Sequence, residues 1–572
     1  MKTVNTLLVA LFVSVFFLST SSTLLAQVPA GQTAGGILQQ EEMKRDAERL
    51  EGRIGKEKEA FKEESLDQID EKDVGPKAMV SMITVEGVVL LPPEDINDIT
   101  ARYEGKELTL RTMQKVADLI TDEYRKAGYA TSRAYLPPQS IQDGFLLIRV
   151  VEGRLGNVTI EGNRYFSSDL LERRMGLTSG NAFDYAELQS ALTRVNEHPD
   201  RDAKVTLAPG KVAGTTDIIV EVEDRFPIHA GFEYDNFGTR FIDEDRFSTI
   251  FEHNNLMGWD DKLYLEYERS EGDLYWLGLM RYTFPINNRL DVGTYFAYSE
   301  TELAKQFKPM MAEGESLVAG FFTNFALIDK LDLDVVLNFG FDYKDITNDL
   351  FGINISEDNV RMLKMGLDVD YADRWGRTIF TPELDIGIPD IMGGMDPKDA
   401  NASRMGAGGK FYKAVANLFR LQPAFLDSTI LWKNQGQFSR YNLVASEQFQ
   451  IGGPYSVRGY PPAEFSGDGG YYTSFEWSFP PYGIPPEMKV PFLDDSLYDA
   501  FRVVAFYDWG YVNVNRTLPG QEQHQTLQGC GFGFRLNLSN SLTARVEVGY
   551  PLGKEASDGE NSRTWVEFTK HF

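Results

Sequence analysis

The sequence predicts two small α+β modules followed by an all-β transmembrane barrel of about 16 antiparallel strands. From residue 227 onward, apolar residues recur at every second position, as they do in strands with one apolar face. Before that point, residues 79–152 and 153–224 show one order of strand and helix signals twice. The mean hydropathy of −0.30 is too low for a bundle of membrane helices, whereas a barrel needs apolar side chains only on its outer face.

Composition narrows the range of functions. The chain has 572 residues and a formal net charge of −28 at pH 7. This acidic balance argues against a nucleic-acid partner, because phosphate binding needs a basic patch. Cys530 is the single cysteine, so no intramolecular disulfide is expected. The five histidines are scattered, and no nucleophile, phosphate-loop or dinucleotide motif is present. We therefore expect no enzymatic activity, no cofactor and no metal site.

Residues 1–26 predict a secretory signal peptide. Lys2 supplies a positive N-terminus, residues 7–18 form an apolar run, and Ala26 marks a cleavage site placed to within several residues. A membrane anchor is the alternative, but the apolar run is too short to span a bilayer.

Residues 27–78 predict a linker and a charged helix. The stretch 27–36 is small and polar, which is typical of a linker, and residues 67–77 predict a second one. Between them, from about residue 38 to 66, charges of both signs surround a narrow apolar stripe at helical spacing. From the residues alone, this helix could be solvated or part of a short coiled coil.

Each α+β module predicts a strand, two helices and two closing strands. In the first module the strands are expected at 80–86, 132–135 and 145–151, and the helices at 94–103 and 109–127. In the second module the strands are expected at 158–161, 203–207 and 217–222, and the helices at 167–175 and 185–196.

The strand Ser132, Arg133, Ala134 and Tyr135 is a candidate binding edge. A small sheet leaves free backbone N–H and C=O groups at its edge, which can accept an extended chain. Pro137 and Pro138 follow directly and would stop the strand. The alternative is a pair of plain spacer modules that bind nothing.

Residues 225–572 predict the barrel. At about 20–24 residues per strand and turn, this length gives about 16 strands, an even number as bacterial barrels have. Alternation between an apolar face and a polar face is clear over 331–343, 363–371, 529–538 and 543–550. The last strand ends on Phe572.

A glycine-rich loop at about 451–470 interrupts this pattern. It carries one cation, Arg458, between Val457 and Gly459-Tyr460. A cation held inside a protein needs a fixed anion. Downstream, Asp508 alternates with Tyr507 and Trp509, so it faces the barrel interior if those aromatics face lipid.

The segment Val457-Arg458-Gly459-Tyr460, paired with Phe506-x-Asp508-x-Gly510, resembles a motif of the BamA-like POTRA–barrel superfamily. It is most similar to the two-partner-secretion transporters (TpsB-type, ShlB/FhaC/HecB-like), which export haemolysins and haemagglutinins. In that family the motif loop folds back into the lumen and its arginine pairs with the strand aspartate. The resemblance implies a lumen lock made of Arg458, Asp508, Val457, Gly459, Tyr460, Phe506 and Gly510. It also implies that the two modules are POTRA domains and that the charged helix plugs the pore.

The resemblance implies an outer-membrane pore of a Gram-negative-type bacterium, with its POTRA domains in the periplasm. These domains would bind an unfolded, secreted partner protein, which the pore exports to the cell surface. Outer-membrane lipid and the barrel assembly machinery are the other expected partners. One alternative is a factor that inserts other barrels, although the best-known such factors carry more than two POTRA units. A passive porin or receptor is another, but it leaves the two modules unexplained.

Overall fold

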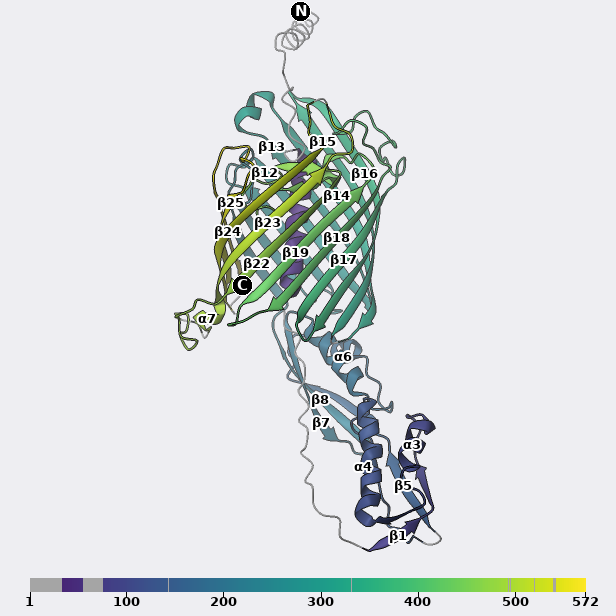
Figure 1. Ribbon diagram of the computed structural model, residues 1–572. Helices are drawn as coiled ribbons and strands as arrows, with labels where there is room; N and C mark the ends of the chain where they lie inside the picture. Colours follow the sequence, from purple (N-terminus) through teal and green to yellow (C-terminus); the bar gives the residue numbers. More distant parts are fainter. Residues whose placement is uncertain are drawn as a thin grey trace, which may run out of the picture.

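The computed structural model consists of a barrel, a helix inside it and two small domains at one end (Figure 1). It describes residues 33–54 and 76–572, except residues 142, 143, 331, 492, 494, 519 and 539–541. The predicted signal peptide, residues 1–26, lies outside the described residues, as does the predicted charged helix beyond residue 54.

The first module contains a three-stranded sheet, a two-stranded sheet and two helices. Its sheet has the order β2-β5-β4, with β2 parallel and β4 antiparallel to the central strand. The elements are β1 Lys77–Val80, β2 Met82–Glu86, α3 Pro93–Thr100, β3 Lys106–Thr109, α4 Leu110–Lys126, β4 Arg133–Tyr135 and β5 Phe145–Val151.

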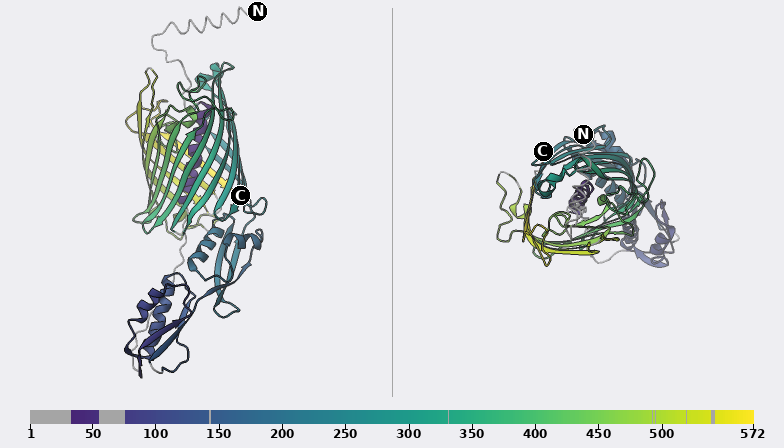
Figure 2. Two further views of the ribbon diagram at one scale, coloured as in Figure 1. Left: turned by 90° about the vertical axis from the view of Figure 1, so that its right-hand side faces the viewer. Right: turned by 90° about the horizontal axis from the view of Figure 1, so that it is seen from above.

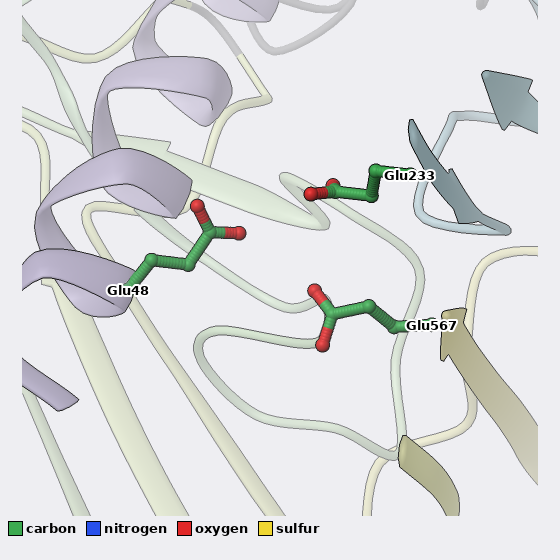
Figure 3. Close-up of side chains that lie close together, drawn as sticks. All are labelled: Glu48, Glu233 and Glu567. Carbon is green, nitrogen blue, oxygen red and sulfur yellow. The ribbon is translucent and has the colours of Figure 1, made fainter. Parts of the chain in front are cut away.

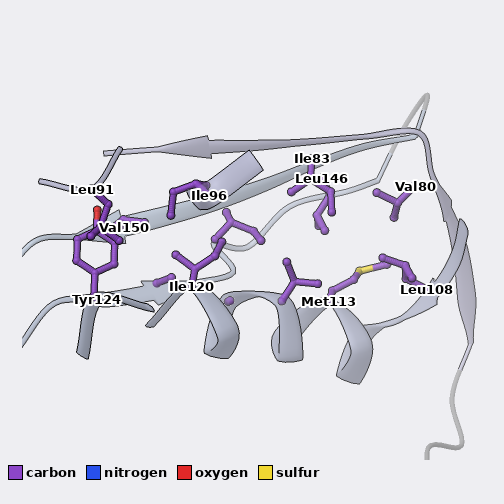
Figure 4. Packing of buried hydrophobic residues seen from close by; sticks show 14 residues of the cluster. Val80, Ile83, Leu91, Ile96, Leu108, Met113, Ile120, Tyr124, Leu146 and Val150 are labelled. Carbon is purple, nitrogen blue, oxygen red and sulfur yellow. The ribbon is translucent and has the colours of Figure 1, made fainter. Parts of the chain in front are cut away.

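One face of α4 supplies five of the fourteen buried hydrophobic residues in the core of this module. Val116, Ala117, Ile120 and Tyr124 recur at helical spacing and are fully buried against the sheet (Figure 4). Thr109 begins the helix, because its side-chain oxygen accepts a hydrogen bond from the N–H of the third residue after it.

The prediction of one strand over 80–86 is wrong in one respect, because the chain forms two strands there, β1 and β2, with a break at Ser81. The N–H groups of Ser81 and Met82 both donate to the carbonyl of Gly144, at 2.8 and 3.2 Å, and this interrupts the strand. β1 then pairs with β3, which the sequence analysis missed. The four residues of β3 show no alternation of apolar and polar side chains that would predict a strand.

The second module repeats the arrangement with a sheet of order β6-β8-β7. Its helices begin at capping residues, Ser167 and Asp184, whose side chains accept hydrogen bonds from backbone N–H groups. The elements are β6 Arg154–Glu161, α5 Ser168–Met175, α6 Tyr185–Asn196, β7 Arg201–Pro209 and β8 Thr215–Asp224.

Sixteen antiparallel strands close into one barrel, as predicted. Ten strands precede residue 424, one lies at 429–439 and five follow the glycine-rich loop. They are β9 Ile228–Asp235, β10 Arg246–His253, β11 Lys262–Ser270, β12 Tyr275–Asn287, β13 Leu290–Glu302, β14 Glu313–Asp329, β15 Leu333–Leu350, β16 Ile353–Asp373, β17 Gly376–Gly387, β18 Tyr412–Pro423, β19 Thr429–Ser439, β22 Gly469–Phe479, β23 Phe501–Asn513, β24 His524–Leu538, β25 Leu542–Pro551 and β26 Arg563–His571.

The two faces of the barrel wall differ as the alternation predicts. On the outer face, Phe339, Tyr507 and Phe532 are 46%, 41% and 47% exposed. On the inner face, Glu476 and Asp508 are buried within the lumen. No helix in the described part of the chain has the length and apolar character needed to cross a membrane. Closure satisfies the backbone hydrogen bonds of the strands, which is what allows a sheet to stand in lipid.

A single helix, α2 Ala34–Ile54, stands inside the barrel (Figure 2). It begins four residues before the predicted start, so the prediction of a linker through residue 36 is wrong at its end. Thr33 Oγ1 accepts a hydrogen bond from Gly36 N at 3.1 Å, and Ala34 N donates to Asn348 Oδ1 at 3.1 Å. These contacts with the barrel stabilise a helix start that the two glycines of the sequence do not indicate.

Candidate functional site: a charged lock in the barrel lumen

The long connection between β19 and β22 folds back into the barrel. It contains the short helix η3 Ala445–Glu447 and a small hairpin of β20 Phe449–Ile451 and β21 Phe465–Gly467. The glycine-rich segment at its tip is enclosed: Val457 and Tyr460 are fully buried and Arg458 is 2% exposed. The loop therefore places a guanidinium group in the lumen with almost no contact with bulk water.

Arg458 and Asp508 form the predicted pair. Arg458 Nε lies 2.8 Å from Asp508 Oδ2, and Nη2 lies 2.7 Å from Oδ1. The backbone N–H of Arg458 also donates to Oδ2, at 3.2 Å. The planar fork of the guanidinium thus meets both carboxylate oxygens, which a lysine could not do.

Two further carboxylates bind the same guanidinium, and the sequence analysis missed both. Arg458 Nη1 donates to Glu476 at 2.8 Å and to Glu547 at 3.0 Å. Arg535 lies between these two acids and forms an ion pair with each. The signal was available, because Glu476 and Glu547 alternate with outward apolar residues on β22 and β25. What the sequence did not show was how deeply the loop enters the lumen, which brings Arg458 within reach of both strands.

Aromatic side chains complete the enclosure of Arg458. The guanidinium carbon lies 3.4 Å from the ring centroid of Phe506, which is on the same strand face as Asp508, as predicted. Trp565 Nε1 donates to the carbonyl of Arg458 at 2.8 Å. Trp565 therefore fixes the backbone of the motif, while the acids fix its side chain.

Glycines allow the loop backbone to approach the wall. A Cβ atom at Gly549 would lie 2.4 Å from the Arg458 carbonyl oxygen, and one at Gly459 would lie 2.6 Å from Pro551 N. Gly510 leaves space for the loop side chains: Val457 and Ile451 lie 2.9 and 3.0 Å from a Cβ built there.

Helix α2 is held in the lumen by ion pairs with several strands. Lys44 forms ion pairs with Glu233 and Asp235 of β9, the latter at 2.9 Å. On other sides, Glu41 pairs with Arg246, Glu42 with Lys344 at 2.9 Å, and Glu51 with Lys433. Apolar contacts cluster at the two ends of the helix, where Ile37, Leu38 and Leu50 are buried.

A group of three carboxylates joins α2, the motif loop and the closing strands of the barrel. Glu48 of α2, Glu233 of β9 and Glu567 of β26 point toward one another (Figure 3). The hydroxyl of Tyr455, in the motif loop, donates to Glu48 at 2.7 Å and to Glu567 at 3.1 Å. Lys44 pairs with Glu233, and Arg545 pairs with Glu567 at 3.1 Å, so two of the three carboxylates have a cation as ion-pair partner.

The same carboxylates lie at the shortest seam of the barrel. β26 and β9 pair over five residues, from Glu567 opposite Asp235 to His571 opposite Gly231. Neighbouring pairs are longer, since β25 and β26 pair over eight residues. The polar contacts of α2 and Tyr455 therefore lie at the point where the barrel closes.

The predicted binding edge lies elsewhere, in the first module, and is not brought near the lumen lock (Figure 1). β4 is an edge strand, but it has three residues and Ser132 lies before it. Ala134 N donates to Thr121 Oγ1 at 3.0 Å, and Ser132 Oγ accepts from Gly153 N at 3.0 Å. Arg133 and Tyr135 point outward and Ala134 is buried. An internal side chain thus already occupies one donor of this edge.

A longer edge borders a groove in the second module. β6 has eight residues and lies at the edge of its sheet, but internal contacts occupy its first half: Leu155 hydrogen-bonds to residues 180 and 181, and Asn157 N donates to Asp217 Oδ1 at 2.8 Å. A groove of about 430 Å³ lies between this strand and the end of α5. Its lining residues are Asn157, Val158, Thr159, Glu172, Met175, Leu177 and Ser179.

Comparisons with known proteins agree with this architecture. A sequence model described as "Haemolysin secretion/activation protein ShlB/FhaC/HecB" matches residues 214–536, and one described as "POTRA domain, ShlB-type" matches residues 79–153. The heme/hemopexin transporter protein HuxB of Haemophilus influenzae is 23% identical over 491 residues, which cover 84% of each chain. The outer membrane transporter CdiB of Escherichia coli is 22% identical over 501 residues, covering 83% of this chain and 80% of that protein.

Solved structures show the same fold. A structure of CdiB from Escherichia coli superposes with a TM-score of 0.76 at 20% identity, covering 96% of this chain and 100% of that one. BamA from Haemophilus ducreyi, in a form lacking its first three POTRA domains, gives 0.51 at 14% identity, covering 87% and 100%. Since the family model spans more than half of the sequence, the chain belongs to the haemolysin secretion/activation family ShlB/FhaC/HecB, a family of outer-membrane transporters.

Proposed function

We propose that this protein exports one large partner protein across the outer membrane by two-partner secretion, a form of type V secretion. The partner would resemble a haemolysin or an adhesin, and it would arrive unfolded from the periplasm. Support comes from the family and from relatives whose names describe transporters, among them the hemolysin transporter protein ShlB of Serratia marcescens, 21% identical over 408 residues that cover 69% of this chain and 70% of that protein.

The observation that carries the proposal is the helix inside the barrel. α2 stands in the lumen, yet its middle is held by ion pairs, such as those of Lys44 and Glu42, and not by an apolar core. Ion pairs of this kind can exchange for water when the helix leaves, whereas a buried apolar face would strongly oppose departure. The resting transporter is thus closed by an element that an arriving chain can replace.

The POTRA domains are the proposed receiving surface. Backbone pairing at a sheet edge recognises an extended chain without requiring one sequence. The edge Arg133–Ala134–Tyr135 is one candidate, although the Thr121 contact must be released for it to pair fully. The β6 edge is the other, because Val158 and Thr159 in its second half border a groove that can hold side chains of the added strand.

The free energy for export would come from folding of the partner outside the cell. The sequence carries no phosphate-binding loop that would indicate ATP use. A chain that folds after emerging cannot slide back, so folding alone gives the movement a direction.

Deletion of the gene tests the proposal. We expect one large protein to disappear from the culture medium or cell surface while the amounts of other outer-membrane barrels stay unchanged, and re-expression of the intact chain should restore it. A general loss of barrels would instead identify an assembly factor, and an unchanged secreted proteome would contradict export.

A further inference from the structure

A large apolar hollow lies on the outer wall of the barrel, away from the lumen. Its volume is about 630 Å³, within the range of small-molecule sites. It spans β15 to β19 and the start of β22. Side chains that line it from the lipid-facing positions are Leu337, Met365, Leu367, Pro382, Leu384, Ala414, Ala416 and Phe438, with Gly436 between them.

Small residues make the floor of this hollow. In the strand register, Pro382 lies opposite Ala416, and Ala416 lies opposite Gly436, so three neighbouring strands carry short side chains at one level. Larger side chains rise around them: Met365 is 46% exposed and Phe438 is 62% exposed. A lipid-facing wall normally presents a more even layer of long apolar side chains, so this row of small residues leaves room for part of a bound molecule.

The strand ladder is irregular beneath the hollow. Pairing between β16 and β17 runs from Asp373 to Val369, then resumes at Gly366, and skips residues 367 and 368. Pro382 stands opposite this gap and has no N–H to donate. Proline inside a central strand is unusual. Together with the skipped pairs, it interrupts the hydrogen-bond ladder directly beneath the hollow.

Two cations lie above the hollow. Arg440 directly follows β19, and Lys410 lies two residues before β18, so both stand at the ends of the strands that carry the floor. Both side chains are exposed. This end of the barrel is opposite the POTRA domains, which in this family are periplasmic, so the cations lie at the outer leaflet (Figure 1).

We propose that this surface binds a phosphorylated, acylated glycolipid of the outer leaflet, of the lipid A class. One acyl chain lies in the hollow against Ala414, Ala416 and Gly436, and a headgroup phosphate lies between Lys410 and Arg440. In a membrane, every lipid chain is apolar, so burial in lipid does not by itself select an occupant. Selection comes from close packing over the small residues and from charge pairing at the headgroup level.

The chemistry favours a phosphorylated glycolipid over a neutral lipid. Two cations at the headgroup level raise the affinity for an anionic lipid about 30-fold over a neutral one.

Retained lipid on the full-length protein measures this binding. The protein is reconstituted in vesicles of phosphatidylethanolamine with either purified lipid A or phosphatidylglycerol, extracted in mild detergent, and analysed by native mass spectrometry. We expect the wild type to retain lipid A. Lys410→Ser with Arg440→Ser should lower that retention about 30-fold, and Ala416→Trp, which fills the floor, should abolish it.

Matched controls change the same residue types elsewhere. Ala505→Trp places the same bulk at another outward position, on β23, and Lys308→Ser removes an exposed cation from a different segment; both should retain lipid A like the wild type. Equal retention by the wild type and the hollow variants would overturn the proposal. Retention of phosphatidylglycerol as strong as that of lipid A would also overturn it.

Discussion

Arg458 is surrounded by more negative charge than a single ion pair would supply. Asp508, Glu476 and Glu547 all accept hydrogen bonds from its guanidinium, and Arg535 shares the two glutamates. Removing one member of a buried ionic group leaves its partners unsatisfied, which costs about 3–5 kcal/mol when burial is complete. The free-energy cost of each substitution should therefore depend on how many ionic partners the substituted residue has.

Arg458→Ala should impair export more than Asp508→Ala. The first change removes the cation from Asp508 and leaves Glu476 and Glu547 to Arg535 alone on this side, whereas the second leaves Arg458 paired with both glutamates. Arg458→Lys should also be impaired, because an ammonium group cannot reproduce the fork. A secretion assay at matched barrel levels measures the effect. Arg269→Ala, at an exposed ion pair, is the control and should export normally. Wild-type export by both lock variants would refute a role for the pair.

Gly549→Ala should resemble the Arg458 variants. Its new Cβ would lie 2.4 Å from the Arg458 carbonyl oxygen, and a backbone atom cannot move aside as a flexible side chain can. Gly278→Ala is the matched control, since its nearest neighbour would be 3.7 Å away. Heat-modifiability on gels reports barrel folding, and the secretion assay reports function. Equal export by the two variants would show that the close approach of loop and wall has no role.

At the scale of single elements, α2 stands out because its contacts with the barrel strands are mainly ion pairs. Its charged side chains match charges on β9, β10, β15 and β19, and Tyr455 connects it to the motif loop. These polar contacts, made with strands on several sides of the barrel, specify the position of the helix in the lumen.

Deletion of residues 34–54 should raise single-channel conductance in planar bilayers, because the helix occupies the lumen. Lys44→Met should raise the open probability as well, since it leaves Glu233, Asp235 and Glu268 facing an apolar side chain. Arg49→Met serves as the control, because that side chain is half exposed and its ion pair with Asp368 is long, at 3.7 Å. If conductance is the same with and without the helix, α2 does not close the pore.

The receiving edge can be located by photo-crosslinking. A benzoylphenylalanine placed at Thr159, on the β6 edge, should form adducts with the exported partner during secretion. The same probe at Arg133 tests the β4 edge, where we expect fewer adducts because Thr121 already occupies the Ala134 donor. Lys211, in the exposed hairpin of the second module, is the control position. Adducts at Arg133 but not at Thr159 would identify the β4 edge, and not the β6 edge, as the receiving surface.

At the scale of the whole molecule, the second POTRA domain is docked on the barrel by buried polar groups. Arg201 binds Asp260, in the turn between β10 and β11, through two hydrogen bonds of 2.8 and 2.9 Å. His198 Nε2 lies 2.8 Å from the carbonyl of Asn254, and its Nδ1 accepts from Asp200 N. Burial and the nearby Arg201 lower the pKa of His198 from 6.5 to about 4.

This junction should loosen on acidification. The folded protein keeps His198 neutral, so the unfolded state binds more protons between pH 6.5 and 4. The contribution to stability is therefore complete above pH 6.5 and is lost as pH falls, by on the order of 2 kcal/mol at pH 5. Hydrogen exchange of the β7 and α6 amides, corrected for intrinsic rates, measures it. His198→Gln should flatten the difference between pH 7 and pH 5, and an equal pH dependence in both proteins would contradict this account.

The sequence by itself determined the features that repeat or alternate. Strand alternation from residue 227 onward predicted the barrel, because one face must meet lipid at every second residue, and the length of that region predicted about 16 strands. Apolar spacing on α4 and α6 predicted the module helices. The lone Arg458 required an anion, and the alternation around Asp508 placed a carboxylate on the inner face.

Only the tertiary structure decided which distant residues meet. Glu476, Glu547 and Arg535 are inward on their own strands, but their approach to Arg458 depends on barrel closure and on the depth of the loop. The early start of α2 depends on Asn348, more than 300 residues away in the chain. The β1–β3 pair likewise depends on Gly144, which ends the first strand from across the module. Local patterns report which face a side chain takes, whereas contacts between elements arise from closure, register and loop path, which no short stretch of sequence encodes.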